Sequence, residues 1–357
     1  MSVGKMIKKL GAQGNPSEIV LPDRVIKRQR PRNLRTEDQH LFAHEYEVHL
    51  PSTSHHRLGP VTASGLSVFD WANPLQSITL SYPWGKRTEA ILRSLNRSRP
   101  ALFRSRQTLD QGVWISDQWS RNYFHWITDA LPRVGLARQL GVSAPLVIPE
   151  FVAQRAHVIE SLNWLGENWL LADEGRHLKV AKLHMFSPLA PTGNPDPYLI
   201  DRLRDTLLAP LRSESSRANE DKTSAPERIW VSRQKTRRRR ISNEGQIRDL
   251  IEKNGFLIVY PEDLNFAEQV ELFSSAKVIA GLHGAGLTNM VFMEEGSTVC
   301  EVRRFGDFHN NSFFALADAA GHNYRYLLTQ PGAHFSSDGD CIVDGQELGR
   351  VLDQLGS

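Results

Sequence analysis

The second half of the chain alternates short apolar runs with amphipathic stretches. The apolar runs 228–231, 256–260, 278–280, 298–302 and 324–328 have the length and composition of buried strands. A helix is predicted from a cap at Ser242 or Asn243 to 253, where Asn254-Gly255 ends it. Further helices are predicted over 266–275, from 285 onward, and over 309–320. Five strands with intervening helices predict a Rossmann-like domain.

The first half shows weaker alternation. Short β-like stretches are predicted at 46–50, 67–69, 77–80 and 112–115, between Pro, Gly and Ser clusters. Further on, 144–149 and 178–186 read as buried strands, and 152–165 and 196–208 as helices, a spacing that favours βαβ units with parallel pairing. A last amphipathic helix is predicted over 345–355.

The length of 357 residues predicts two domains, with one large domain as the alternative. Residues 209–227 are polar and contain Ser and Pro, which is typical of a linker. We therefore expect an N-terminal α/β domain over 36–208 and a C-terminal Rossmann-like domain over 228–357. Residues 1–35 are basic and lack periodicity, so we expect a flexible arm there.

A glycine-rich turn lies at the centre of the second half, in the stretch 277–292 (KVIAGLHGAGLTNMVF). A buried strand leads to His283, passes through Gly284, Ala285 and Gly286, and resumes as an apolar helical pattern that includes Asn289. Backbone N–H groups at such a strand-to-helix turn can bind a phosphate. The alternative is a tight βα turn with an incidental histidine.

Basic groups and a carboxylate follow the neighbouring strands. Arg233 comes after the first strand, the run 237–240 contains Arg239 and Arg240, and Glu301 lies near the end of the fourth strand. Converging cations suit a diphosphate, and a carboxylate can accept hydrogen bonds from ribose hydroxyls. The arginine run has other readings, namely a solvated loop, a nucleic-acid contact or a targeting signal.

A second constellation lies at 122–133 (NYFHWITDALPR). His125 and Asp129 are spaced i and i+4, so they share one face of a helix and can form an acid/base unit. Asn122 is the expected N-cap, and Pro132 is expected to bend the helix and leave Arg133 near the bend. Trp126 could stack on a sugar ring. A surface ion pair is the alternative for His125 and Asp129.

Composition limits the classes of function. The chain is 40% hydrophobic and 23% charged with a net charge of +3, values of an ordinary globular protein. It has neither an apolar run of membrane-spanning length nor a signal-peptide pattern, and two cysteines (Cys300 and Cys341) cannot form a disulfide framework. We expect a cytoplasmic protein that binds no nucleic acid, whose basic residues could contact anionic lipid at the inner face of a membrane.

Common catalytic signatures are absent, including G-x-S-x-G, H-E-x-x-H, Walker A and G-x-G-x-x-G. Asp338-Gly-Asp340 has the D-x-D form of a metal–nucleotide site but falls in a polar stretch away from any predicted strand end, so we interpret it as a turn.

These blocks, in this order, resemble glycosyltransferase family 61, whose bacterial members are described as capsular polysaccharide biosynthesis proteins. The resemblance rests on NYFHWITDALPR, VSRQKTRRRRISNEGQI, HGAGLTN and TVCEV, and covers about Asn122 to Val302. It implies an α/β protein of GT-B architecture, with two Rossmann-like domains facing across a cleft. It also implies metal-independent transfer of a sugar, with inversion, from a nucleotide sugar to a glycan or lipid-linked glycan, without a resident cofactor.

The resemblance also assigns residues. It places the donor, most simply a UDP-sugar, on the C-terminal domain at Arg233, Arg239 or Arg240, Asn243, Glu244, His283, Gly284, Ala285, Gly286, Asn289 and Glu301. It matches His125 and Asp129 to the family's N-x-x-H-x-x-x-D core. We expect these two residues to be the catalytic pair, either of which could be the base, with Asn122, Trp126 and Arg133 on the acceptor side. The competing functions are a non-catalytic nucleotide-sugar-binding subunit of a polysaccharide assembly complex and a nucleotide-sugar epimerase or dehydrogenase.

Overall fold

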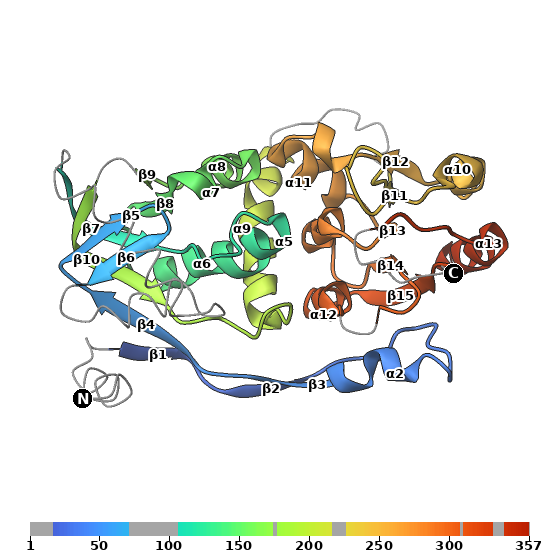
Figure 1. Cartoon of the computed structure of the whole chain (residues 1–357), viewed down its shortest axis with the longest axis horizontal. Coiled ribbons are helices and arrows are strands. Elements are labelled where there is room, and N and C mark those ends of the chain that lie inside the picture. The colour runs from blue at the N-terminus through green and yellow to red at the C-terminus, as the bar shows by residue number, and fades with distance from the viewer. Residues whose placement is uncertain are drawn as a thin grey trace. The chain divides into compact units, whose positions relative to one another are not determined.

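The computed structural model describes residues 17–70, 106–173, 177–215, 226–307, 310–330 and 339–356. Its internal contacts divide the chain into two units, each formed by two separate segments of the chain. Unit 1 contains Met1–Arg24 and Leu50–Pro191, and unit 2 contains Val25–His49 and Thr192–Ser357. Both units combine helices with a β-sheet (Figure 1), so the expected α/β class is confirmed.

Unit 2 is built on a five-stranded sheet in which every neighbouring pair is parallel. In chain order its strands are β11 (Arg228–Val231), β12 (Leu257–Val259), β13 (Val278–Leu282), β14 (Thr298–Arg303) and β15 (Asn323–Leu328). The order across the sheet is β12-β11-β13-β14-β15, which is the flavodoxin-like doubly wound arrangement. All five predicted strands are therefore present, within two residues of the predicted ends.

The helices of unit 2 also follow the sequence pattern closely. They are α9 (Pro197–Ser215), α10 (Glu244–Lys253), α11 (Phe266–Ser274), α12 (Ser312–Ala319) and α13 (Gly345–Asp353), with shorter 3₁₀ segments η4 (Pro261–Asp263), η5 (Ala285–Phe292) and η6 (Gln354–Gly356). α9 packs against α11, η5 and α12, whereas α10 packs against α13. The turn at Gly284 thus opens a 3₁₀ helix, not the α-helix that the apolar pattern suggests.

A separate early segment belongs to unit 2. It comprises β2 (Arg24–Lys27), α2 (Gln39–Phe42), η1 (Ala43–Glu45) and β3 (Glu47–Leu50), and β2 pairs with β3. Phe42 is fully buried, and its ring centroid lies 5.1 Å from that of Phe314 and 6.0 Å from that of Tyr324. The Tyr326 hydroxyl donates to Asp38 over 2.6 Å. Aromatic packing therefore fixes this basic segment to the β15 side of unit 2.

Unit 1 contains an eight-stranded mixed sheet. Its strands are β1 (Ser17–Leu21), β4 (Thr53–Leu58), β5 (Val61–Ser64), β6 (Ser67–Asp70), β7 (Arg106–Trp114), β8 (Leu146–Pro149), β9 (Trp169–Ala172) and β10 (His177–Phe186). The strands β10, β7, β8 and β9 run parallel in that order, whereas β1, β4, β5 and β6 pair antiparallel. Only the parallel part has the βαβ character that the sequence predicts.

One composite helix follows β7 in unit 1. It starts as α5 (Tyr123–His125), passes through a π-helical segment η3 (Trp126–Ala130) and continues as α6 (Leu131–Gln139). Pro132 lies in the first turn of α6, where the missing N–H is tolerated. The helix predicted over 152–165 is two helices, α7 (Glu150–Ala153) and α8 (Ala156–Trp164), because Arg155 is extended.

The division into units differs from the expected boundaries. Residues 25–49 belong with the C-terminal residues, and the second unit begins at Thr192, before the expected linker. α9 extends to Ser215, so it covers the first residues of that linker, while residues 216–225 lie outside the described part. The strand expected at 77–80 and residues 1–16 of the expected arm also lie outside it. No described helix has the length and apolar character of a membrane-spanning helix.

Candidate functional site

The sheet of unit 2 changes winding direction between β11 and β13. β12 lies on one side of β11, and β13, β14 and β15 follow on the other. In doubly wound sheets, ligands bind outside the carboxyl ends of the strands at this switch point. β11 ends at Val231, just before Arg233, and β13 ends at Leu282, just before His283. The two sequence features predicted to form an anion site therefore meet at the switch point.

Arg233 lies directly over Gly284. A Cβ added to Gly284 would overlap the Arg233 guanidinium, so only glycine leaves room for this arginine in its present position. The Arg233 Nε donates to the Arg239 carbonyl over 3.0 Å, which folds the basic loop back onto the arginine. Arg239 has φ +60°, a left-handed conformation that is uncommon for a residue with a side chain. Backbone strain of this kind is concentrated at functional sites.

The cations at this turn are incompletely balanced by carboxylates. Burial lowers the pKa of Arg233, and the positive charges of Arg239 and Arg304 lower it further, whereas Glu262 raises it. Arginine stays protonated under all ordinary conditions, so its lowered pKa reflects first the cost of burying this charge and second the repulsion from the neighbouring cations. A bound diphosphate would offset that buried positive charge. Arg304 follows β14 and was missed because it lies outside the arginine run.

His283 is held by a buried carboxylate. Its Nδ1 contacts Glu301 Oε1, and the Tyr324 hydroxyl donates to Glu301 Oε2. With Nδ1–H donating to Glu301, Nε2 is an acceptor and lies 2.9 Å from the Asn310 side-chain amide. The Phe313 ring centroid lies 4.8 Å from that of the imidazole. The ring is therefore fixed in orientation and tautomer, as in metal and catalytic sites.

Glu301 has a different role from the one expected. It is fully buried, and both its carboxylate oxygens are engaged by His283 and Tyr324, so it offers nothing to a ribose. Burial alone would raise its pKa, but His283, Arg303 and Tyr324 together hold the pKa below its usual value. The carboxylate stays ionised and positions His283. Its burial could not be read from a strand end alone.

Most of the other residues expected to bind the donor make hydrogen bonds or ion pairs within the protein. The Arg240 guanidinium is paired with Asp340, and both side-chain groups of Asn243 bond to the backbone of Val343. Asn289 is fully buried and donates to Gln269. Glu244 is buried, accepts from Ser232 Oγ, and has its pKa raised by burial. Ala285 and Gly286 are half-buried beside the turn.

In unit 1, His125 and Asp129 form the expected pair. His125 Nδ1 lies 2.7 Å from Asp129 Oδ2, and both side chains keep some exposure, 15% and 27%. The Thr128 hydroxyl lies 2.9 Å from Asp129 Oδ1 and also 2.9 Å from the Phe124 carbonyl, so it can donate to one at a time. Asp129 falls in the π-helical segment, and such π-bulges occur frequently at functional sites.

The neighbours of this pair differ in their exposure. Asn122 caps the helix as predicted, because its side chain accepts from the Phe124 N–H. Trp126 is fully buried with its indole N–H bonded to Ser161, and Arg133 is buried in an ion pair with Asp117. The buried Trp126 ring therefore offers no exposed face for the sugar stacking that the sequence suggested, and the Arg133 guanidinium is engaged within the protein. Trp119, which the sequence reading missed, is 45% exposed, with its ring centroid 5.8 Å from that of His125.

The D-x-D segment is in part outside the described residues. Asp340 is described, and it pairs with Arg240 through the side chain and the backbone N–H. Within the described ranges, no group of three or more His, Cys, Asp or Glu side chains is arranged to hold a metal ion.

Comparison with known proteins agrees with the resemblance. Residues 123–300 match the family model described as Glycosyltransferase 61, and a search of curated proteins gave no match. The matched segment includes His125, Asp129, Arg233, His283 and Gly284, but ends one residue before Glu301. The match supports the assignment of this chain to glycosyltransferase family 61 and, with it, a glycosyltransferase activity.

Proposed function

We propose that the protein is an inverting, metal-independent glycosyltransferase that moves a sugar from a nucleotide sugar to a hydroxyl of a glycan or lipid-linked glycan. The observation that carries the donor half is the cluster Arg233, Arg239 and Arg304 at the switch point of a doubly wound sheet. These three cations, with Arg233 lying against the glycine-rich turn, provide the charge that a departing nucleoside diphosphate requires.

The architecture and setting belong to the same proposal. We expect unit 1 to take the acceptor and unit 2 the donor, in a GT-B arrangement. The acceptor would be a capsule, exopolysaccharide or lipopolysaccharide precursor, and the donor a UDP-sugar. We expect the enzyme to work in the cytoplasm, where its basic residues could contact an anionic membrane surface.

His125 is the base that we favour. Asp129 Oδ2 accepts a hydrogen bond from Nδ1–H of His125, so Nε2 carries the lone pair that removes the proton from the acceptor hydroxyl. The oxygen then attacks the anomeric carbon as the bond to the diphosphate breaks, and the leaving charge is stabilised by Arg233 and by the backbone at Gly284. Asp129 fixes the tautomer and stabilises the imidazolium that forms. The exposed indole of Trp119 is available to stack on the acceptor sugar.

The decisive experiment measures transfer from a panel of nucleotide sugars, chosen by thermal shift, and determines the anomeric configuration of the product by NMR. His125→Gln is expected to lower kcat by a factor of about 10²–10⁴ and to leave donor binding unchanged. Asp129→Asn should lower kcat by less, because the base remains. Retention of configuration would rule out the single displacement.

The same assay separates the alternative functions. A non-catalytic binding subunit would bind a nucleotide sugar yet show neither transfer nor slow donor hydrolysis. An epimerase or dehydrogenase would convert the donor without an acceptor, and a dehydrogenase would change the absorbance of added NAD.

A further inference from the structure

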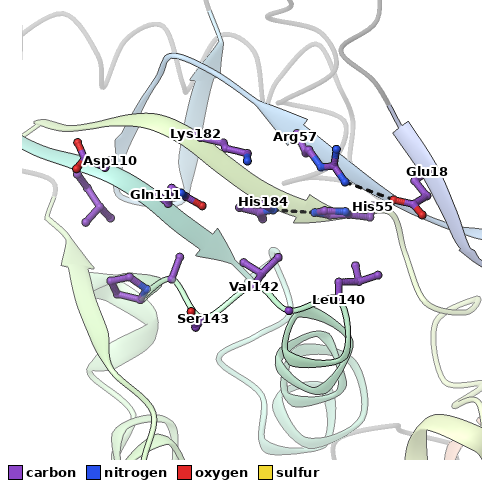
Figure 2. A pocket seen from close by; sticks show the side chains of 14 residues that line it. Glu18, His55, Arg57, Asp110, Gln111, Leu140, Val142, Ser143, Lys182 and His184 are labelled. Carbon is purple, nitrogen blue, oxygen red and sulfur yellow. Dashed lines mark hydrogen bonds and ion pairs between the residues drawn. The ribbon is translucent and has the colours of Figure 1, made fainter.

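A polar pocket lies in unit 1, on one face of its sheet (Figure 2). Its volume is about 770 Å³, within the range of small-molecule sites. The walls come from β1, β4, β7 and β10 and from the segment that follows α6. The lining residues used below are Glu18, His55, Arg57, Gln111, Lys182 and His184.

The pleat of the sheet explains why these side chains share a face. His184 on β10 lies opposite Arg57 on β4, and Lys182 lies opposite Gln111 on β7. Paired residues and residues two apart on one strand point to the same side. His55, which precedes Arg57 by two positions, therefore joins them. This pocket could not be predicted from the sequence, because polar residues occupy both faces of β4 and no alternation of polar and apolar residues marks the side that faces it.

Two buried histidines form the floor of the pocket. His55 is 2% exposed and His184 3% exposed, and the His55 Nε2 lies 2.9 Å from the His184 Nδ1. The remaining nitrogens, His55 Nδ1 and His184 Nε2, are buried and have no hydrogen-bond partner among the described residues. Buried polar groups without partners are costly, and a native structure that keeps two of them needs a reason.

The pair offers one donor and one acceptor in either tautomer. If His55 donates to His184, then His184 Nε2 carries a proton and His55 Nδ1 a lone pair; the opposite direction exchanges these roles. Burial lowers the pKa of His184 to about 4, with further lowering by His55, Lys182 and Arg57, and burial also lowers the pKa of His55. Both rings are neutral at pH 7. A hydroxyl, which both donates and accepts, matches such a pair.

Two cations, Arg57 and Lys182, and two carboxylates, Glu18 and Asp110, also line the pocket. Lys182 is exposed and makes no hydrogen bond or ion pair with any described residue, and Arg57 is paired with Glu18 at 3.4 Å. Leu140 and Val142 supply apolar contact from the segment after α6 (Figure 2). The combination of hydroxyl-binding groups, apolar surface and an unpaired ammonium favours a charged sugar over a simple anion.

We propose that this pocket binds a saccharide unit carrying a negative charge, with the charge at Lys182 and the hydroxyls at the His55–His184 pair. The pocket is separate from the catalytic pair: His125 and Asp129 precede α6, whereas the pocket is lined by the residues after it, about 14 Å further along the helix axis. It is therefore a second saccharide site, which goes beyond sugar transfer and does not depend on it. Its charge could be a carboxylate or a phosphate.

The test is a titration of the full-length protein with four probes: glucuronate, glucose 6-phosphate, glucose and inorganic phosphate. At least one of the acidic sugars should bind with a Kd of about 1 mM or below, roughly tenfold tighter than glucose and than inorganic phosphate. Preference for glucuronate assigns a carboxylate, and preference for glucose 6-phosphate assigns a phosphate.

Three variants locate the binding. Lys182→Met should weaken it at least about tenfold, whereas Lys179→Met, which removes the same charge from the opposite face of β10, should not change it. His184→Gln should weaken it severalfold, with folding checked by the melting temperature. Arg233→Ala should leave it unchanged, which separates this site from the donor site.

Three results would overturn the proposal. The first is that inorganic phosphate binds as tightly as glucose 6-phosphate while glucuronate does not bind. The second is that neither acidic sugar binds below about 10 mM. The third is that the Lys182→Met protein binds them as the native protein does. The first would leave a simple anion site, and the others would remove the site.

Discussion

Arg233 and Gly284 act as one unit at the residue scale, although they are separated by fifty residues of sequence. The glycine has no side chain at the point that the guanidinium occupies, so the arginine can reach the end of the neighbouring strand. The positive potential around Arg233 is thereby placed beside backbone N–H groups. Glycine at position 284 therefore allows the Arg233 guanidinium to approach the backbone closely.

Gly284→Ala tests this packing. The added methyl would push the guanidinium aside, and a side chain can move at little cost to folding, so the melting temperature should stay nearly unchanged. Affinity for a nucleoside diphosphate should fall at least about tenfold, or about 1.4 kcal/mol. Gly245→Ala on α10, where an added methyl meets open space, is the matched control and should keep full affinity. Equal affinity in both proteins would contradict the packing argument.

The sequence predicted which residues stand at strand ends but not which ones are exposed. Arg233 and His283 meet because parallel strands end at one sheet edge, a relation that follows from the chain order. Glu301 and Trp126 lie in the same predicted regions, yet both are fully buried. Their burial depends on contacts with Tyr324 and Ser161, which are distant in sequence. No local pattern carries that information.

At the element scale, the composite helix from Tyr123 to Gln139 carries His125 and Asp129, the pair that we propose to be catalytic. Its π-helical segment contains Asp129, and its first turn is capped by Asn122, whose side chain accepts from the Phe124 N–H over 2.9 Å. The cap lies three residues before His125. The position of the imidazole therefore depends on the start of the helix.

Asn122→Ala removes this cap. Loss of an N-cap costs about 0.5–2 kcal/mol, so we expect a lower melting temperature. We also expect transfer activity to fall severalfold, with donor affinity unchanged, because the first turn that carries His125 would fray. Asn122→Ser, which can still cap, should restore both properties. An Asn122→Ala protein with full activity and full stability would show that the cap does not position His125.

Elements of the second half were predictable because a parallel sheet covered by helices makes each strand a continuous apolar run. β11 was predicted to the residue. The strands of unit 1 were harder, because β4 reads Thr-Ser-His-His-Arg-Leu and exposes a polar face. The 3₁₀ character of η5 was also missed, since an apolar run of eight residues looks the same in both kinds of helix.

At the scale of the whole molecule, the early segment 25–49 packs against the residues that hold His283. The Phe42 ring packs against Tyr324, whose hydroxyl donates to Glu301, which in turn holds His283. The Arg303 guanidinium carbon lies 4.9 Å from the centre of the Phe42 ring. A flexible arm was predicted over residues 1–35 because they are basic and lack periodicity. The packing of Phe42, which follows them in sequence, could not be recognised from that pattern.

Stability should depend on pH through buried neutral histidines. Burial lowers the pKa of His322 to about 4, although a hydrogen bond to the Met290 carbonyl opposes this shift. Between about pH 6.5 and 4 the unfolded chain binds a proton at this residue and the native protein does not. The contribution of the neutral His322 to the free energy of unfolding is complete above about pH 6.5. Below that pH, down to about pH 4, the free energy of unfolding falls by about 1.4 kcal/mol per pH unit.

Thermal melts at several pH values check this contribution. His322→Gln can still donate to the Met290 carbonyl but cannot be protonated, so its melting temperature should fall less steeply between pH 6.5 and 4.5 than that of the native protein. Glu244 and Asp318, whose pKa values are raised by burial, act in the opposite direction in both proteins. Parallel curves would show that His322 does not titrate on unfolding.

The central claim, that unit 2 holds the diphosphate of a nucleotide-sugar donor at Arg233, is tested most directly by calorimetric titration with uridine diphosphate. We predict that the native protein binds it, that Arg233→Ala weakens binding at least about tenfold, and that Arg237→Ala, which removes an exposed arginine from the same loop, binds nearly as the native protein does. Equal affinity of the Arg233→Ala and native proteins, or equal losses in the two variants, would contradict the account.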